Sequence, residues 1–179
     1  MGSSLVFWAG RHAQANRAAF PKMTKEATKW LGARGMRWNQ LIPKVKLLLK
    51  REQAPDVLMV HLGGNDLASI SRGKLTRFIK NDLKLLQKWM PKTRLVWSDI
   101  TTRREYRHAV SNARVEVARK TMNSAVRTHI ARMGGNAIKH PLLIWSNKSL
   151  FIHDGVHLSR KGNEILLQDW QAGLSLIKK

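Results

Sequence analysis

The sequence predicts an α/β fold, a three-layer αβα sandwich in which helices cover both faces of a mostly parallel sheet. Short apolar runs alternate with longer amphipathic stretches along the chain, and this alternation is typical of repeated strand–helix–strand units. Residues 57–62 (Val-Leu-Met-Val-His-Leu) are nearly all apolar, as are strands that are buried on both faces. The chain has 179 residues and shows neither a repeat nor a linker, so we expect residues 1–179 to form one domain.

The first half of the chain contains two expected helices and two expected strands. Residues 5–19 are expected to be helical up to Phe20-Pro21, because proline does not continue a helix. Residues 24–31 alternate in polarity and end in Trp-Leu, which favours a strand. Residues 38–51 place apolar side chains every three or four positions, the period of an amphipathic helix. Residues 57–62 follow as the second strand.

The second half of the chain repeats the alternation. Residues 75–90 carry their apolar side chains on one helical face and end before a proline. Residues 94–100 (Arg-Leu-Val-Trp-Ser-Asp-Ile) form the next expected strand. Residues 110–133 are expected to form a long helix, because the two glycines that follow it are typical of a helix C-terminus. Residues 136–140 are a short final strand, and residues 159–176 are the last helix.

The beginning of the chain departs from this scheme. A doubly wound sheet normally opens with a strand, but only Met1-Gly2 precede the first expected helix. We therefore expect the first strand to be truncated, or its missing part to lie upstream of this sequence. A missing central strand would leave backbone groups of its neighbours unpaired. A cost of several kcal/mol would be large against a domain stability of roughly 5–15 kcal/mol.

The net charge is unusually positive. Thirty-three Lys and Arg residues against eleven Asp and Glu residues give a formal charge of +22. Between residues 72 and 132 there are sixteen basic and four acidic residues, so the excess is spread over helices and is not confined to a tail. Such a field attracts polyanions without a specific site. Two interpretations stay open: a basic surface that keeps the protein soluble, and contact with RNA, DNA or an anionic membrane surface.

Several classes of protein are excluded by composition. The chain has no cysteine, which excludes disulfides, a thiolate nucleophile and cysteine-ligated zinc. No apolar stretch approaches the roughly 18 residues that span a bilayer. The N-terminus lacks the basic-then-apolar layout of a signal peptide. These features favour an intracellular, cytoplasmic protein, and the oligomeric state stays open.

Four polar segments are expected at the carboxyl edge of the sheet, where open α/β sheets bind their ligands. Each of them follows an expected strand or precedes an expected helix. They are Gly2-Ser3-Ser4, Gly32-Ala33-Arg34-Gly35, Gly63-Gly64-Asn65-Asp66 and Asp154-Gly155-Val156-His157.

Ser4 and Asn65 each allow two interpretations. A serine at a helix start is commonly an N-cap, but its hydroxyl also lies near free backbone N–H groups and the positive end of the helix dipole, where an anion is stabilised. An asparagine between glycines is commonly a turn residue. After a buried strand, however, its carboxamide can also donate to a developing oxyanion.

Asp154 and His157 are three positions apart across a glycine, so a turn can bring the carboxylate to one imidazole nitrogen. The other nitrogen would then face a nucleophile, as in catalytic triads. A metal site formed by His153, Asp154 and His157 is the alternative. The remaining histidines lack such company and are expected to be structural or solvated: His12, His61, His108, His129 and His140.

Taken in chain order, the four segments resemble the SGNH (GDSL-type) hydrolases, a family of lipases, esterases and acetylhydrolases. The family opens with Gly-Asp-Ser, and Gly2-Ser3-Ser4 stands in that place with Ser3 instead of the aspartate. The family's Gly-x-Asn-Asp is matched by residues 63–66 and its Asp-x-x-His by residues 154–157. The resemblance covers essentially the whole chain and implies a flavodoxin-like parallel sheet.

The resemblance implies a carboxylic ester hydrolase that acts without a cofactor or a metal. Ser4 would be the nucleophile, His157 its base and Asp154 the group that orients His157. The backbone N–H groups of Ser4 and Gly35 and the Asn65 amide would form the oxyanion hole. Because no lid or long apolar funnel is evident, small acetyl-type esters are the expected substrates.

A narrower resemblance concerns Trp-Leu-Gly-Ala-Arg-Gly-Met-Arg-Trp and His-Leu-Gly-Gly-Asn-Asp-Leu. These stretches are similar to vertebrate SGNH-like domains, some of them related to the esterase domain of first-frame proteins in LINE-type retrotransposons. This suggests the alternative function, a basic nucleic-acid-binding module on a catalytically weak or inactive SGNH scaffold.

Overall fold

The computed structural model describes residues 1–23, 28–107 and 109–177. Its helices and strands, in chain order, are α1 (Ser4–Ala15), α2 (Leu41–Leu49), β1 (Val57–Val60), α3 (Arg72–Trp89), β2 (Arg94–Ser98), α4 (Asn112–Arg132), β3 (Asn136–Ile138) and α5 (Arg160–Ser175). Short 3₁₀ helices lie at Pro21–Met23, Trp38–Gln40 and Lys148–Leu150. Across the described part of the chain, no helix combines the length and the apolar character that crossing a bilayer requires.

The sheet is parallel, and its three regular strands lie in the order β1-β2-β3. Gly2 extends it beyond β1, because it forms parallel bridges with His61 on one side and with Gly32 on the other. The spatial order is therefore Gly32, Gly2, β1, β2, β3, which is the flavodoxin-like order with its first two strands reduced to single bridges. The prediction of an α/β fold with a parallel sheet is confirmed. Since all segments run the same way, their carboxyl ends share one edge.

Two predicted elements at the N-terminal end are wrong in extent. The helix predicted over residues 5–19 ends at Ala15, because Asn16 leaves the helical conformation (φ −126°, ψ +50°) while its side chain donates to His12 O. Of the strand predicted over residues 24–31, residues 24–27 lie outside the described residues and residues 28–31 have no regular structure. In the described part of this segment and its continuation, the first residue with a β-bridge is Gly32, and its bridge partner is Gly2.

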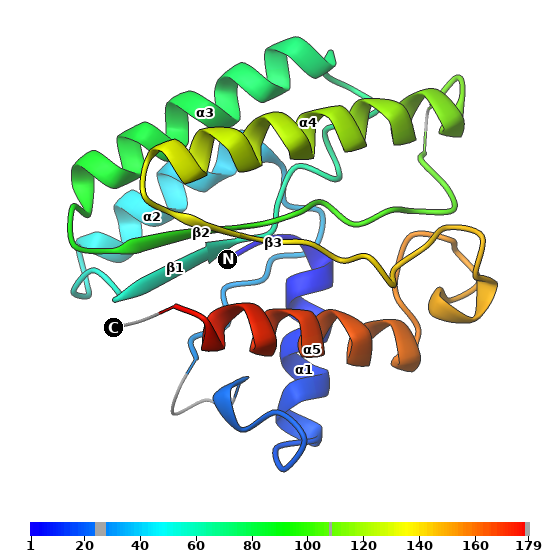
Figure 1. Cartoon of the computed structure of the whole chain (residues 1–179), viewed down its shortest axis with the longest axis horizontal. Coiled ribbons are helices and arrows are strands. Elements are labelled where there is room, and N and C mark those ends of the chain that lie inside the picture. Colours follow the sequence, from blue (N-terminus) through cyan, green and yellow to red (C-terminus); the bar gives the residue numbers. More distant parts are fainter. Residues whose placement is uncertain (24–27, 108, 178–179) are drawn as a thin grey trace.

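The helices form layers on both faces of the sheet (Figure 1). Helices α2, α3 and α4 cover one face, and α1 and α5 cover the other. Strand β2 shows how one strand serves both layers: Leu95 and Trp97 belong to the core under α3 and α4, whereas Val96 belongs to the core under α1 and α5. These alternating side chains are almost completely buried, as a strand between two helical layers requires.

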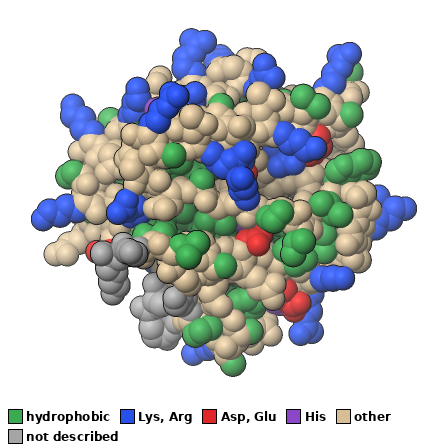
Figure 2. Space-filling model, in the orientation of Figure 1, with side chains coloured by type: hydrophobic (Ala, Val, Ile, Leu, Met, Phe, Trp, Pro, Cys, Tyr) green, Lys and Arg blue, Asp and Glu red, His purple; other side chains and the backbone are tan. Residues whose placement is uncertain are grey.

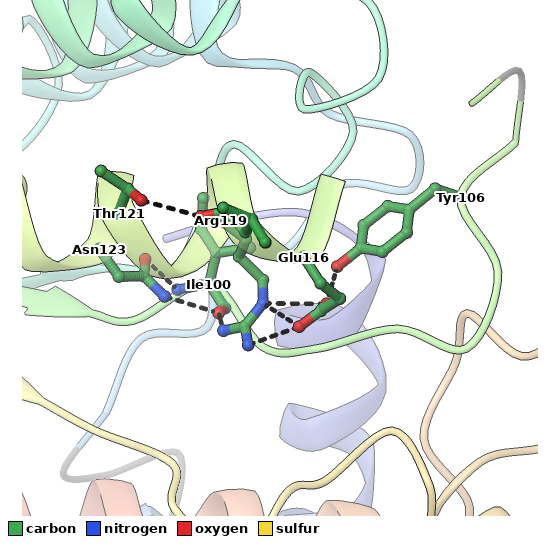
Figure 3. A network of polar contacts seen from close by, with 7 residues as sticks. Ile100, Tyr106, Glu116, Arg119, Thr121 and Asn123 are labelled. Atoms are coloured by element: carbon green, nitrogen blue, oxygen red, sulfur yellow. Dashed lines mark hydrogen bonds and ion pairs between the residues drawn. The ribbon is translucent and has the colours of Figure 1, made fainter. Parts of the chain in front are cut away.

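A network of polar contacts fastens the loop that follows β2 to helix α4 (Figure 3). The Asn123 amide donates to Ile100 O at 2.9 Å and accepts from Ile100 N–H at 3.0 Å. Arg119 also donates to Ile100 O, at 2.8 Å, and pairs with Glu116, which accepts from the Tyr106 hydroxyl. Burial alone would raise the pKa of Glu116, but the hydrogen bonds from Arg119 and Tyr106 lower it below its ordinary value. The ionised Glu116 carboxylate thus helps to hold the loop, because it accepts hydrogen bonds from both Arg119 and Tyr106.

Candidate active site

Three polar side chains from the two ends of the chain meet at the carboxyl edge of the sheet. Ser4 is the first residue of α1, and Asp154 and His157 lie in the loop before α5. His157 Nε2 lies 3.0 Å from Ser4 Oγ, and His157 Nδ1 lies 2.5 Å from Asp154 Oδ2. Helices α1 and α5 pack against each other and bring these distant segments together. The structure therefore places the three residues that the sequence singled out in one hydrogen-bonded chain.

The loop geometry holds the Asp154 carboxylate in its ionised form. Its Oδ1 accepts from the backbone N–H groups of Val156 and His157, both at 2.9 Å, while Oδ2 faces the imidazole. Gly155 closes the turn with a φ of +65°, a conformation that glycine adopts without steric cost. Burial alone would raise the pKa of Asp154, but the hydrogen bonds from the His157 ring and the two backbone groups lower it to about 2.

The ionised carboxylate determines the direction of the remaining hydrogen bonds. An ionised Asp154 only accepts, so His157 Nδ1 carries the hydrogen that it donates. In the neutral ring, Nε2 is then an acceptor and takes a hydrogen bond from the Ser4 hydroxyl. A hydroxyl aimed at a basic nitrogen can lose its proton as the oxygen attacks an electrophile.

Ser4 is not the N-cap of its helix. The N-cap position belongs to Ser3, whose side chain makes no capping hydrogen bond, and the Ser4 hydroxyl turns to His157 instead. Ser4 is only 7% exposed. Its approach to the sheet depends on Gly2, because a Cβ atom there would lie 2.1 Å from His61 O. The interpretation of Ser4 as a capping residue is therefore wrong for this structure.

Asn65 and Gly35 lie in loops that touch each other. Asn65 Nδ2 donates to Met36 O at 3.0 Å, and Asn65 Oδ1 accepts from Arg103 Nη2 at 3.0 Å. Gly35 directly precedes Met36 in an exposed turn with a φ of +70°. Among the described residues, neither Asn65 nor Gly35 forms a hydrogen bond to Ser4, Asp154 or His157. One of the two amide N–H bonds of Asn65 is thus committed to Met36, and its carbonyl is committed to Arg103.

Arg103 is a residue of this region that sequence reasoning missed. It is only 8% exposed, and a Cβ atom on Gly64 would lie 2.8 Å from its Nη2, so the glycine leaves room for the guanidinium. Burial lowers the pKa of Arg103, and the charges of Asp154 and Asp66 oppose that shift. Arg103 is one of thirty-three basic residues, and no motif distinguishes it from the others.

The alternative metal site is not formed. The described residues contain no group of three His, Cys, Asp or Glu side chains that could hold a metal ion. His153 is exposed, and the Asp154 and His157 side chains bond to each other.

A second serine–histidine–aspartate chain lies inside the molecule. Ser98 Oγ lies 2.9 Å from His140 Nε2, and His140 Nδ1 lies 2.9 Å from Asp169 Oδ2. The same Ser98 oxygen also receives the Trp170 N–H at 2.8 Å and faces His61 Nδ1 at 2.8 Å. The sequence-based view that His140 and His61 lack such company is wrong, whereas the expectation of a structural role fits their burial. Ser98 itself is 0% exposed, so no substrate reaches it.

Comparison with known proteins identifies the fold. No family model matches the sequence, and no curated protein matches it. Among solved structures, a member of the lipolytic protein G-D-S-L family from Veillonella parvula superposes with a TM-score of 0.75 at 10% identity, over 98% of this chain and 96% of that one. A GDSL-like lipase from Bacteroides thetaiotaomicron gives 0.71 at 14% identity, over 98% and 84%.

A third similar structure carries a bound inhibitor. The psychrotrophic esterase EstA from Pseudoalteromonas sp., inhibited by monoethylphosphonate, gives a TM-score of 0.66 at 13% identity, over 96% of this chain and 85% of that one. The chain therefore has the α/β fold of the GDSL/SGNH hydrolases, as its sequence predicts. The narrower relation to LINE-type esterase domains stays a prediction.

Proposed function

We propose that this protein hydrolyses carboxylic esters, with Ser4 as the nucleophile, His157 as the general base and Asp154 as the residue that orients His157. The observation that carries the proposal is the unbroken hydrogen-bond chain from Ser4 Oγ to His157 Nε2 and from His157 Nδ1 to Asp154. The similar structures are lipases and esterases, which supports the same class of reaction. Ser98 does not compete for the role, because its oxygen is buried and already has three partners.

The reaction proceeds through an acyl-enzyme. Ser4 Oγ bonds to the ester carbonyl carbon while its proton moves to His157 Nε2. The bond to the alcohol oxygen then breaks, and the alcohol leaves with that proton. Water repeats the sequence: its oxygen bonds to the acyl carbon, its proton passes to His157, and Ser4 is released together with the carboxylic acid. Asp154 stays ionised throughout and stabilises the imidazolium.

The oxyanion of the tetrahedral intermediate is held, in this proposal, by the backbone N–H groups of Ser4 and Gly35 and by the Asn65 amide. Arg103 and Met36 support the last assignment, because they engage opposite ends of the amide and thereby fix which way it faces. The second N–H bond of Asn65 is then available to the substrate. Loss of one such donor typically lowers turnover by about 10²–10³-fold, so Asn65→Ala should weaken hydrolysis without abolishing it.

The substrates we propose are small acyl esters of the acetyl type. The decisive experiment compares hydrolysis of p-nitrophenyl acetate and p-nitrophenyl octanoate by the wild type and by Ser4→Ala. Turnover of the acetate by the wild type, and its loss in Ser4→Ala with an unchanged melting temperature, is the expected result. Mass spectrometry after treatment with a fluorophosphonate should find the adduct on Ser4. An adduct on another residue, or equal turnover by the two proteins, would refute the proposal.

A further inference from the structure

A groove lined by residues of α3 and α4 lies on the surface, and these two helices lie on the opposite side of the sheet from α1 and α5 (Figure 1). Its volume is about 360 Å³, and its lining includes Arg72, Thr76, Arg77, Lys80, Thr121 and Met122. We call it the α3–α4 groove. Three of these six side chains are cationic and come from successive turns of one helix, so a line of positive charge follows the groove.

The charge of this groove is not neutralised by nearby acids. Helices α3 and α4 contain two acidic residues, Asp82 and Glu116. Asp82 accepts from the Trp38 indole at 2.7 Å, and Glu116 is paired with Arg119. Among the described residues, Arg72, Arg77 and Lys80 take part in no ion pair. Figure 2 shows Lys and Arg side chains projecting over the part of the molecule that α3 and α4 form.

The positive field continues along the helix pair beyond the groove. His129 on α4 contacts Lys80 O on α3, with 3.2 Å between Nε2 and the oxygen. The pKa of His129 is lowered first by burial and then by the positive charges of Lys80, Lys84 and Arg132. Lys80, Lys84 and Arg132 therefore add positive charge near this contact between α3 and α4.

The exposed ring of Phe78 lies outside the groove. Phe78 is 40% exposed, and Lys74 Nζ lies 5.8 Å from the centre of its ring. Phe78 does not line the groove, and Asp82, one helical turn further along the same face of α3, bonds to Trp38 just before α2. The groove itself supplies the positive charge that follows the backbone of a single-stranded nucleic acid.

We propose that the α3–α4 groove binds single-stranded nucleic acid, with Arg72, Arg77 and Lys80 at its phosphates. The concave shape favours a strand over a membrane, because a flexible polyanion can enter a groove between two helices and a bilayer surface cannot. A membrane surface would also demand a broad exposed apolar area, whereas the apolar side chains of the groove lining are the buried Met122 and the small Ala125. Since α1 and α5 cover the other face, binding here is independent of the ester hydrolysis proposed above.

The test measures fluorescence anisotropy of a labelled 20-nucleotide oligouridylate at several KCl concentrations. The variant R77A/K80A is compared with K46A/K50A, which removes the same charge from exposed lysines on and just after α2. We expect the groove variant to bind at least tenfold more weakly and the α2 variant to change binding by less than about threefold. The slope of log K against log[KCl] should fall by about 1.4 in the groove variant, because each phosphate contact to a single strand contributes about 0.7.

Three further results bear on the proposal. Phe78→Ala should change binding by less than about threefold, because Phe78 lies outside the groove, and a loss as large as that in R77A/K80A would overturn the proposal. Circular dichroism of each variant verifies that it is folded. Equal weakening in R77A/K80A and K46A/K50A would overturn the proposal in favour of diffuse attraction. Groove-dependent binding to vesicles of phosphatidylcholine and phosphatidylserine, without groove-dependent binding to the oligonucleotide, would overturn it in favour of a membrane surface.

Discussion

Replacement of Ser98 by alanine should lower the free energy of unfolding far more than the same replacement of a surface serine, although Ser98 takes no part in the proposed reaction. The Ser98 oxygen meets three buried groups: the Trp170 indole N–H, His61 Nδ1 and His140 Nε2. A serine hydroxyl has one hydrogen and two lone pairs, so these three partners use all of its capacity. At most one imidazole nitrogen can accept the single hydroxyl hydrogen. The other imidazole and the indole must therefore both donate.

The cost follows from that count. Ser98→Ala leaves two N–H donors without their acceptor in a fully buried place, and each such donor costs about 1–3 kcal/mol. The expected loss in the free energy of unfolding is therefore about 2–6 kcal/mol, against a typical total of about 5–15 kcal/mol. The matched control is Ser146→Ala, since Ser146 is exposed and such substitutions usually stay within about 0.5 kcal/mol.

Urea unfolding followed by tryptophan fluorescence at pH 7 measures both variants. The two serine–histidine–aspartate chains should then respond in opposite ways. Ser98→Ala is expected to lose stability and, while still folded at low temperature, to keep fluorophosphonate labelling; Ser4→Ala is expected to keep stability and lose labelling. A change below about 1 kcal/mol in Ser98→Ala would refute the hydrogen-bond count. Loss of labelling in folded Ser98→Ala would show that the internal chain takes part in catalysis.

Three other perturbations have definite expected outcomes. Asp154→Asn should lower kcat for p-nitrophenyl acetate about 10⁴-fold by disturbing the His157 tautomer, and normal turnover would remove Asp154 from the triad. Burial holds the pKa of His61 well below 6.5. Just below pH 6.5, His61 is therefore protonated in the unfolded chain but neutral in the folded chain. The free energy of unfolding, from urea curves at pH 5–7, should therefore fall as the pH drops below about 6.5, by up to about 1.4 kcal/mol per pH unit from this group; a rise would contradict its burial. Gly2→Ala should lower the melting temperature markedly, because its Cβ would lie 2.1 Å from His61 O. Gly73→Ala has open space around the new atom and should stabilise α3 by about 0.5–1 kcal/mol. Equal changes in the melting temperatures of the two variants would contradict the close approach at Gly2.

Local patterns in the sequence were sufficient to predict most of the fold. Helix α3 and strand β1 were predicted within three residues of their observed ends, because their apolar periodicities are unbroken and a proline limits each of them. Residues 28–31, the described part of the strand predicted over residues 24–31, form no strand, because alternation alone does not provide a neighbour to pair with. In the part of the chain that the structure describes, Gly2 is the residue that pairs with the end of this segment, through Leu31 O and a bridge to Gly32, and one residue does not support a regular strand pair.

The proposed triad could be predicted for a different reason. Asp154 and His157 are held by a turn only four residues long, and their spacing is therefore a local property. The Ser98–His140 contact depends instead on the register of β2 against β3, in which Ser98 pairs with Ile138. No local pattern encodes the meeting of residues 42 positions apart. Arg103 was missed for the same reason, since its contact with Asn65 joins two loops after adjacent strands.

The bridges of Gly2 also explain how the proposed nucleophile and the proposed oxyanion donors are held in fixed positions relative to one another. Gly2 N–H donates to Leu31 O, Ala33 N–H donates to Gly2 O, and His61 N–H donates to Met1 O. The backbone just before Ser4 is thus bonded on one side to the segment that leads to Gly35 and on the other to the segment that leads to Asn65.

The backbone groups that flank Gly2 are therefore paired where the site lies, which reduces the cost expected for a short first strand at the carboxyl edge. A shift of Gly2 would move Ser4 relative to both oxyanion segments at once. Geometry sensitive to about 1 Å governs the rates of such reactions, so distortion at Gly2 should reduce turnover at temperatures where the domain is still folded.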